Sequence, residues 1–334
     1  MTPTVVAAVL AAALTHATWN ALAHGIRDQL LAFTLVGSGG ALCGAALACF
    51  VPLPAAGAWP PLLFSAALHV VYQALLMRSF RMGEFGQMYP IARGTAPLVV
   101  TVLAAVFVHE MPDGWQLAGV LLASAGLVGV ALWGLRGAGR SPHAGSGSAA
   151  DSGGAASDVD DAVSDVDDAV SGSGDAVSGS DGVPSGSGTS AGPQWPALTA
   201  AVCTGLAIAS YTVVDGVGVR AAGSPLGYIA WLMLLEGLAI PVWALLTRRR
   251  ALVAELRPVA LRGLLGGALS VLAYGLVLWA QTRAPLAPVA ALRESSIIAG
   301  AAIGALFFKE RFGWPRTAAS VLMVGGIALM LHGT

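Results

Sequence analysis

Ionisable side chains inside long apolar runs are the residues of this sequence that could do chemistry. A charged group in a membrane is costly, so each one predicts either a functional site or a buried pair. The side chains concerned are His16, His69, Arg93, Glu236, Arg293 and Glu294, with Asp215 near the end of a run. The elements of the fold must therefore hold these groups against partners or around a solute.

Two arginines lie at matching places in the chain. Arg93 and Arg293 are 200 positions apart, and each follows the start of an apolar run by about two helical turns. A guanidinium group stays charged and can bind a carboxylate or a phosphate-like group through paired hydrogen bonds. The pair predicts an anion-binding site. The alternative is that the two side chains reach the membrane interface or pair with Glu294 or Glu236.

Glu236 lies near the centre of the run WLMLLEGLAIP, next to Gly237 and Pro241, which favour a helix break. Its carboxyl group is too far from water to be solvated, so it is either protonated or paired with a cation. We predict that Glu236 carries a proton or binds a substrate amine, with a structural pair to an arginine as the alternative. Glu294 has the same two interpretations, proton coupling or an ion pair.

Polar residues at helical spacing accompany the two histidines. His16 and Asn20 are four positions apart and share one helical face, as do His69, Tyr72 and Gln73. A single buried histidine is usually a satisfied core residue, but these neighbours favour a polar cavity. We expect the cavity to be lined by His16, Asn20, His69, Tyr72, Gln73 and Tyr89.

The composition identifies an integral membrane protein. Apolar residues make up 56% of the 334 residues, charged residues 10%, and the mean hydropathy is +0.75. A span needs about 20 apolar residues, and continuous runs of that length indicate helices and not barrel strands. This length criterion predicts ten membrane spans: 4–23, 30–51, 60–80, 87–108, 114–134, 196–218, 226–247, 259–281, 287–308 and 314–332.

The ten spans divide into two halves of five. We predict a first repeat at 1–135, a Gly/Ser/Asp-rich linker at 136–195 and a second repeat at 196–334. The linker contains nine of the eighteen acidic residues and cannot bury enough surface to fold. It has no Glu to close a calcium loop, and the three cysteines have no metal-ligand spacing, so no metal site is expected.

Loop charges predict the orientation. Thirteen Lys and Arg residues fall in the loops after odd-numbered spans and two, Arg220 and Arg283, in those after even-numbered spans. The cytoplasmic side is enriched in these residues, which predicts termini outside the cell (inner) membrane and the linker in the cytoplasm. Because five spans per half is an odd number, the halves enter in opposite directions and form an inverted repeat.

The end of each half resembles the EamA-type permeases of the drug/metabolite transporter superfamily. The motifs are VHEMPDGWQLAGVLLASAG and FKERFGWPRTAASVLMVGG, together with HATWNALAH in the first span. The second copy departs mildly, with Ala319 where the first has Gly119. The resemblance implies ten helices from duplicated five-helix halves and transport of amino acids, sugars, drugs or other metabolites. Glu110 and Glu310, each at the end of an apolar run, are expected to cap or orient the following helix.

These observations predict a secondary transporter and not an enzyme. The substrate would be an amino acid or another carboxylate- or phosphonate-bearing metabolite, moved by alternating access with proton coupling as an option. No GxxxxGK[ST] motif or catalytic set occurs, so no ATP, cofactor or nucleic-acid partner is expected. Alternatives are a flippase for a lipid-linked substrate and a membrane scaffold or sensor that uses the linker; a homodimer is left open.

Overall fold

The computed structural model describes residues 1–24, 26, 28–82, 85–138, 195–248, 250–299 and 314–332. Met1–Gly139 and Pro193–Thr334 form one compact unit. The predicted linker lies outside the described residues except at its two ends. The main helices are α1 (Pro3–His24), α2 (Gln29–Ala48), α3 (Trp59–Met82), α4 (Phe85–Leu103), α5 (Gly114–Ala138), α6 (Trp195–Ala221), α7 (Pro225–Arg248), α8 (Arg250–Leu256), α9 (Ala260–Gln281), α10 (Leu286–Arg293) and α12 (Trp314–His332).

The predicted all-helical class is confirmed for the described ranges, where no strand occurs. Within them, four segments are long and apolar enough to cross a membrane: Leu30–Ala48, Val202–Ala221, Pro225–Arg248 and Ala254–Gln281. Three shorter apolar helical segments are Arg93–Val108, Gly114–Gly129 and Thr317–His332. The lengths and composition fit a multi-pass membrane protein.

Two of the helices that carry predicted site residues are irregular. After Leu103, α4 continues as a π-helical turn, η2 (Ala104–Val108), which ends at His109 in the left-handed conformation. The prediction of one continuous helix over 287–308 is wrong at its centre. There α10 ends at Arg293, a turn follows at Glu294 and Ser295, and residues 296–299 are helical again. Hydropathy alone does not reveal this break, because the flanking residues remain apolar.

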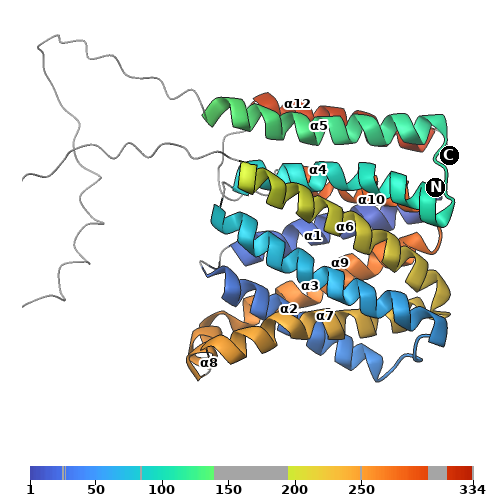
Figure 1. The fold of residues 1–334 in the computed structure, drawn as a ribbon. Coiled ribbons are helices and arrows are strands. Elements are labelled where there is room, and N and C mark those ends of the chain that lie inside the picture. Colours follow the sequence, from blue (N-terminus) through green and yellow to red (C-terminus); the bar gives the residue numbers. More distant parts are fainter. Residues whose placement is uncertain are drawn as a thin grey trace, which may run out of the picture. The chain divides into compact units, whose positions relative to one another are not determined.

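Helices from the two halves of the chain pack in pairs. The closest packing joins α5 with α12 and α2 with α7, and α3 lies against α6 and α1 against α9. Figure 1 shows α5 and α12 running side by side along their lengths. The first two of these pairs bring segments that are about 200 residues apart into direct contact.

Glycines bring the α2 and α7 backbones together. A Cβ atom on Gly37 would lie 2.9 Å from the carbonyl oxygen of Gly237, and one on Gly237 would lie 2.6 Å from that of Gly37. Real Cβ atoms do not approach a backbone so closely, so both positions require glycine. Small residues of this kind let membrane helices pack without a hydrophobic force between them.

The α5 and α12 pair has the same kind of contact twice. A Cβ atom on Gly119 would lie 2.5 Å from the carbonyl oxygen of Gly326, and one on Gly126 would lie 3.1 Å from that of Ala319. At an offset of 200 positions, Gly119 corresponds to Ala319 and Gly126 to Gly326. The two contacts therefore exchange partners, as in a two-fold symmetric interface.

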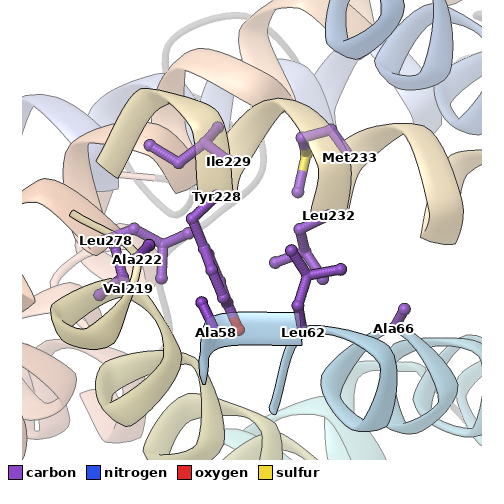
Figure 2. Packing of buried hydrophobic residues seen from close by; sticks show 10 residues of the cluster. All are labelled: Ala58, Leu62, Ala66, Val219, Ala222, Tyr228, Ile229, Leu232, Met233 and Leu278. Carbon is purple, nitrogen blue, oxygen red and sulfur yellow. The ribbon is translucent and has the colours of Figure 1, made fainter. Parts of the chain in front are cut away.

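A hydrophobic cluster lies between the helices that carry the polar residues. It joins the start of α3 to the ends of α6 and α9 and to one face of α7 (Figure 2). Its fully buried members are Ala58, Leu62, Ala66, Val219, Ala222, Tyr228, Ile229, Leu232, Met233 and Leu278. Tyr228 is its one polar member, and its hydroxyl group needs a partner because burying an unpaired hydroxyl is costly.

The start of α10 is held by a glutamate from the first half. Oε2 of Glu110 accepts a hydrogen bond from the backbone N–H of Leu286 (2.7 Å), and its Oε1 lies 2.5 Å from Nη1 of Arg220. Arg220 also donates to the carbonyl oxygens of Gln281 (2.7 Å) and Ala284 (3.0 Å). Glu110 thus caps α10 and not the following helix α5, for which Asp113 accepts from Gln116 N–H (2.7 Å). Glu310 lies outside the described residues.

Candidate functional site

Arg93 and Glu294 form an ion pair between α4 and the turn after α10. Nε of Arg93 lies 2.8 Å from Oε2 of Glu294, and the side chains are 2% and 3% exposed. A second guanidinium nitrogen of Arg93 donates to Oγ of Ser296 (3.2 Å). The negative charge of Glu294 therefore neutralises Arg93, and the pair fastens the break in the ninth apolar segment to α4.

Arg293 precedes Glu294 in sequence but has different surroundings. One of its guanidinium nitrogens donates to the hydroxyl oxygen of Tyr211 on α6 (3.1 Å), and its Cζ atom lies 5.9 Å from the ring centre of Tyr274 on α9. Among the described residues, no carboxylate lies within ion-pair distance of this guanidinium group. Arg293 is thus a buried cation whose direct contacts are uncharged, with donors left for an anion.

His69 on α3 and Glu236 on α7 face each other. Nε2 of His69 lies 3.4 Å from Oε2 of Glu236, and the side chains are 7% and 13% exposed. Nδ1 of His69 lies 3.0 Å from the carbonyl oxygen of Ser65. Nδ1 also lies 3.2 Å from Oγ of Ser65, whose hydroxyl hydrogen is directed to the Asp215 carboxylate. Because the carbonyl oxygen only accepts and this hydroxyl hydrogen is used elsewhere, Nδ1 carries a hydrogen and Nε2 is the nitrogen left to face Glu236.

Tyr211 connects these two groups. Its ring stacks on His69 with a centroid distance of 3.9 Å, while its hydroxyl oxygen accepts from Arg293. Tyr72 and Tyr274 contact the same ring edge-on, at 5.7 and 6.3 Å. One aromatic side chain therefore separates the buried arginine from the histidine and glutamate pair.

Asp215 on α6 is fully buried and bound by tyrosines. The hydroxyl group of Tyr228 donates to Oδ1 (2.9 Å) and that of Tyr274 donates to Oδ2. Ser65 also hydrogen-bonds this carboxylate. Ser65 thereby lies between Asp215 and His69, and the aspartate completes a polar cluster to which α3, α6, α7, α9 and α10 contribute.

The remaining predicted cavity residues are placed less centrally. His16 on α1 lies within the electrostatic field of Arg93 and Arg293 and accepts at Nδ1 from the indole N–H of Trp19 (3.2 Å). The Asn20 amide donates to the carbonyl oxygen of His16 (2.9 Å), so it bonds its own helix. Gln73 is half-buried on α3, and the side chain of Tyr89 on α4 lies outside the described part.

No group of three or more potential metal ligands gathers anywhere in the described ranges. The cluster is instead built from pairs of opposite or complementary side chains. Its chemistry is ionic and hydrogen-bonding, which suits recognition of a charged solute and movement of protons.

Comparison with known protein families gives a match for the second half of the chain. Residues 195–332 match the model of the EamA-like transporter family. Over these residues, which make up less than half of the chain, the protein is similar to the EamA-like transporters. This family is part of the drug/metabolite transporter superfamily, so the resemblance found in the sequence is confirmed. No curated protein matches the chain.

A solved structure matches this chain over most of its length. It is described only as the crystal structure of a protein. The two structures match with a TM-score of 0.64 and a sequence identity of 16%. The match covers 98% of this chain and 99% of that chain. At this identity the likeness shows the fold alone. The family match and the apolar helices together support a multi-pass membrane protein.

Tyrosines are the part of the candidate site that the sequence did not predict. The chain has five tyrosines, and four of them, Tyr72, Tyr211, Tyr228 and Tyr274, contact the cluster or each other there. Of these four, only Tyr72 was predicted. The scarcity of tyrosine in so apolar a chain was a usable signal, because each buried hydroxyl group needs a polar partner.

Proposed function

We propose that this chain is a secondary transporter that moves a small anionic metabolite across the cell membrane by alternating access. The family model supports transport as the general activity. The single observation that carries the finer proposal is the buried guanidinium group of Arg293, whose direct contacts are uncharged, within a cluster built from both halves of the chain. A carboxylate or phosphonate, such as that of an amino acid, would complete its hydrogen bonds.

The break after Arg293 supports a binding site at this place. Transporter sites are commonly formed where membrane helices are interrupted, because the freed ends and side chains there can bind a solute. Here the interruption falls at Glu294 and Ser295, directly after the buried arginine. Arg93 would hold Glu294 in place and would act on the anion through that pair.

We further propose that the two halves form an inverted repeat of ten spans. The exchanged contacts of Gly119 with Gly326 and of Gly126 with Ala319, together with the mutual contact of Gly37 with Gly237, support a two-fold relation at an offset of 200. Such a relation gives two states of similar energy, which alternating access needs. The placement of both termini outside the cell membrane remains a prediction from the loop charges.

Transport assays with the full chain in liposomes test the proposal. Uptake and efflux of labelled amino acids and phosphonates would be measured with and without a proton gradient, for wild type, Arg293→Gln and the control Arg283→Gln. Arg283 is an exposed arginine that contacts the Trp279 ring at 4.7 Å, so its loss should not change flux. We expect gradient-dependent flux of an anion that Arg293→Gln abolishes.

The opposite result would separate the fold from the substrate. If Arg293→Gln moved cationic or neutral compounds as the wild type does, and no anion moved in either protein, the anion site would be refuted. The transporter family would still stand. A chain that moved no compound of any charge would refute the transport proposal itself.

A further inference from the structure

The facing atoms of His69 and Glu236 can share one proton. Because Nδ1 of His69 donates to the Ser65 carbonyl oxygen, a neutral His69 presents a lone pair at Nε2 towards Oε2 of Glu236 at 3.4 Å. Two lone pairs facing each other in a buried place would repel. Oε2 makes no hydrogen bond to another group in the described part of the chain. The contact is therefore favourable only when one of the two atoms carries a proton.

We propose that His69 and Glu236 together form the proton-binding site of this chain, and that a negative charge at Arg293 loads that site. In the loaded state the proton lies on Oε2 of Glu236 and faces Nε2 of His69. In the unloaded state it has left to water, which leaves the Glu236 carboxylate and neutral His69. Proton binding at this pair does not depend on the proposed transport function. Only the role of the pair, to couple proton movement to transport, rests on that function.

The groups around the pair explain why its proton should depend on Arg293. From α10, the positive field of Arg293 reaches His69. From α6, the field of Asp215 reaches Glu236, and Tyr211 stacks on the imidazole ring. From α9, Tyr274 contacts the ring edge-on at 5.4 Å. The α2 helix, which packs on α7, has no charged residue.

Arg293 and Asp215 act on the proton in opposite directions. A positive charge nearby disfavours a proton on the pair, whereas the Asp215 carboxylate favours it. An anion bound to Arg293 would cancel the unfavourable field. Binding of the anion and loading of the proton would then favour each other, and by linkage each would raise the affinity for the other by the same factor. That reciprocity is what proton-driven uptake of an anion requires.

Infrared spectroscopy tests the site without a substrate. The full chain in phosphatidylethanolamine and phosphatidylglycerol liposomes would be taken stepwise from acid to alkaline pH, and the carbonyl band of buried protonated carboxyl groups followed. Wild type carrying ¹³C-labelled glutamate or ¹³C-labelled aspartate assigns the band to a residue type without any substitution. We expect a glutamate band that disappears at alkaline pH and is absent from Glu236→Gln but present in Glu294→Gln and Asp215→Asn.

The variant Arg293→Gln then tests the coupling. Removing the positive charge should move the disappearance of the band to higher pH by about one unit, a tenfold gain in proton affinity. Arg283→Gln should leave it in place. A His69→Gln variant should change the band frequency, because the carboxyl group loses its imidazole partner.

Three results would overturn the inference: no glutamate band at any pH, a band that persists in Glu236→Gln, or a band whose loss is unmoved by Arg293→Gln. Transport is scored separately. Anion flux that keeps its dependence on the proton gradient in Glu236→Gln would refute the coupling site and leave the transporter intact. A titrating pair in a chain that moves no anion would refute the proposed substrate instead.

Discussion

Nε of Arg93 lies 2.8 Å from Oε2 of Glu294, the residue that directly follows Arg293. Two arginines at equivalent sequence positions therefore have different partners, one an acidic side chain and the other a tyrosine hydroxyl group. The sequence pattern predicted a matched pair of anion-binding arginines. In the structure Arg93 instead pairs with Glu294, which is the alternative that the sequence left open.

The buried pair predicts a characteristic pattern of stabilities. Arg93→Gln or Glu294→Gln alone leaves one buried charge without its partner, which costs about 3–5 kcal/mol. The double variant removes both charges and should recover part of that loss. Thermal unfolding of the purified protein in lipid nanodiscs measures the cycle. Arg248→Gln, at partly exposed pairs with Asp28 and Glu255, is the control and should cost about 0–1 kcal/mol. A double variant as unstable as the sum of the two single variants would contradict the pairing.

Glu110 should stabilise α10 through two separate bonds. Glu110→Gln keeps an acceptor for the Leu286 N–H and loses the charge opposite Arg220, at a cost of about 0–1 kcal/mol because that ion pair is partly exposed. Glu110→Ala loses both bonds and should cost about 1–3 kcal/mol more. Hydrogen exchange at the Leu286 amide provides the local measurement. We expect faster exchange in Glu110→Ala than in Glu110→Gln, and equal rates would exclude the cap.

The contact between α5 and α12 predicts opposite effects for two glycines of one helix. Gly119→Ala places a methyl group against the Gly326 backbone and should destabilise the pair by about 1–3 kcal/mol. Gly129→Ala meets nothing within 4 Å and should stabilise α5 by up to about 1 kcal/mol through helix propensity. Thermal unfolding of both variants compares them directly. The same sign for both changes would refute the close packing.

Asp28 predicts a dependence of stability on pH. Partial burial raises the pKa of Asp28, but hydrogen bonds from Arg248 and from the N–H groups of Leu31 and Leu30 outweigh it, so the pKa lies below its ordinary 3.8. A carboxyl group with a lowered pKa in the folded state adds stability that is complete above pH 3.8 and is lost as the pH falls through the folded value. The contribution is small because the group is more than a third exposed.

Asp28→Asn isolates the ion pair from the helix cap. Asparagine still caps the first turn of α2, so this change should remove only the interaction with Arg248, whereas Asp28→Ala should cost about 1 kcal/mol more. Unfolding measured between pH 3 and pH 7 should show the difference from wild type shrinking towards the acid end. A difference that grows with acid would contradict a lowered pKa of Asp28 in the folded state.

The positions of the helices could be predicted from the sequence because one physical quantity determines them. An apolar run of about 20 residues must form a helix that satisfies its own backbone in lipid. The described α1, α6 and α7 begin within one residue of the predicted 4–23, 196–218 and 226–247. The break at Glu294 was missed because the run stays apolar on both sides of it, and the contact of Glu294 with Arg93, 201 positions earlier, is not visible in the sequence.

The site itself was predicted only in part, for the same reason. Charge marked Arg293, His69 and Glu236 as exceptional in an apolar chain, and all three lie in the cluster. Hydropathy does not distinguish Tyr211 from an ordinary core aromatic residue. Its importance comes from lying between His69 and Arg293, and a single sequence does not contain that spatial relation.

The gathering of tyrosines gives the protein a built-in label. At least four of its five tyrosines belong to one polar cluster, so replacing every tyrosine by 3-fluorotyrosine would put at least four of five fluorine nuclei there. The ¹⁹F spectrum of the intact chain would then report almost entirely on that place, without any engineered cysteine or attached dye. A solute that enters the cluster should shift several resonances together, whereas one that adheres elsewhere should shift none of the four.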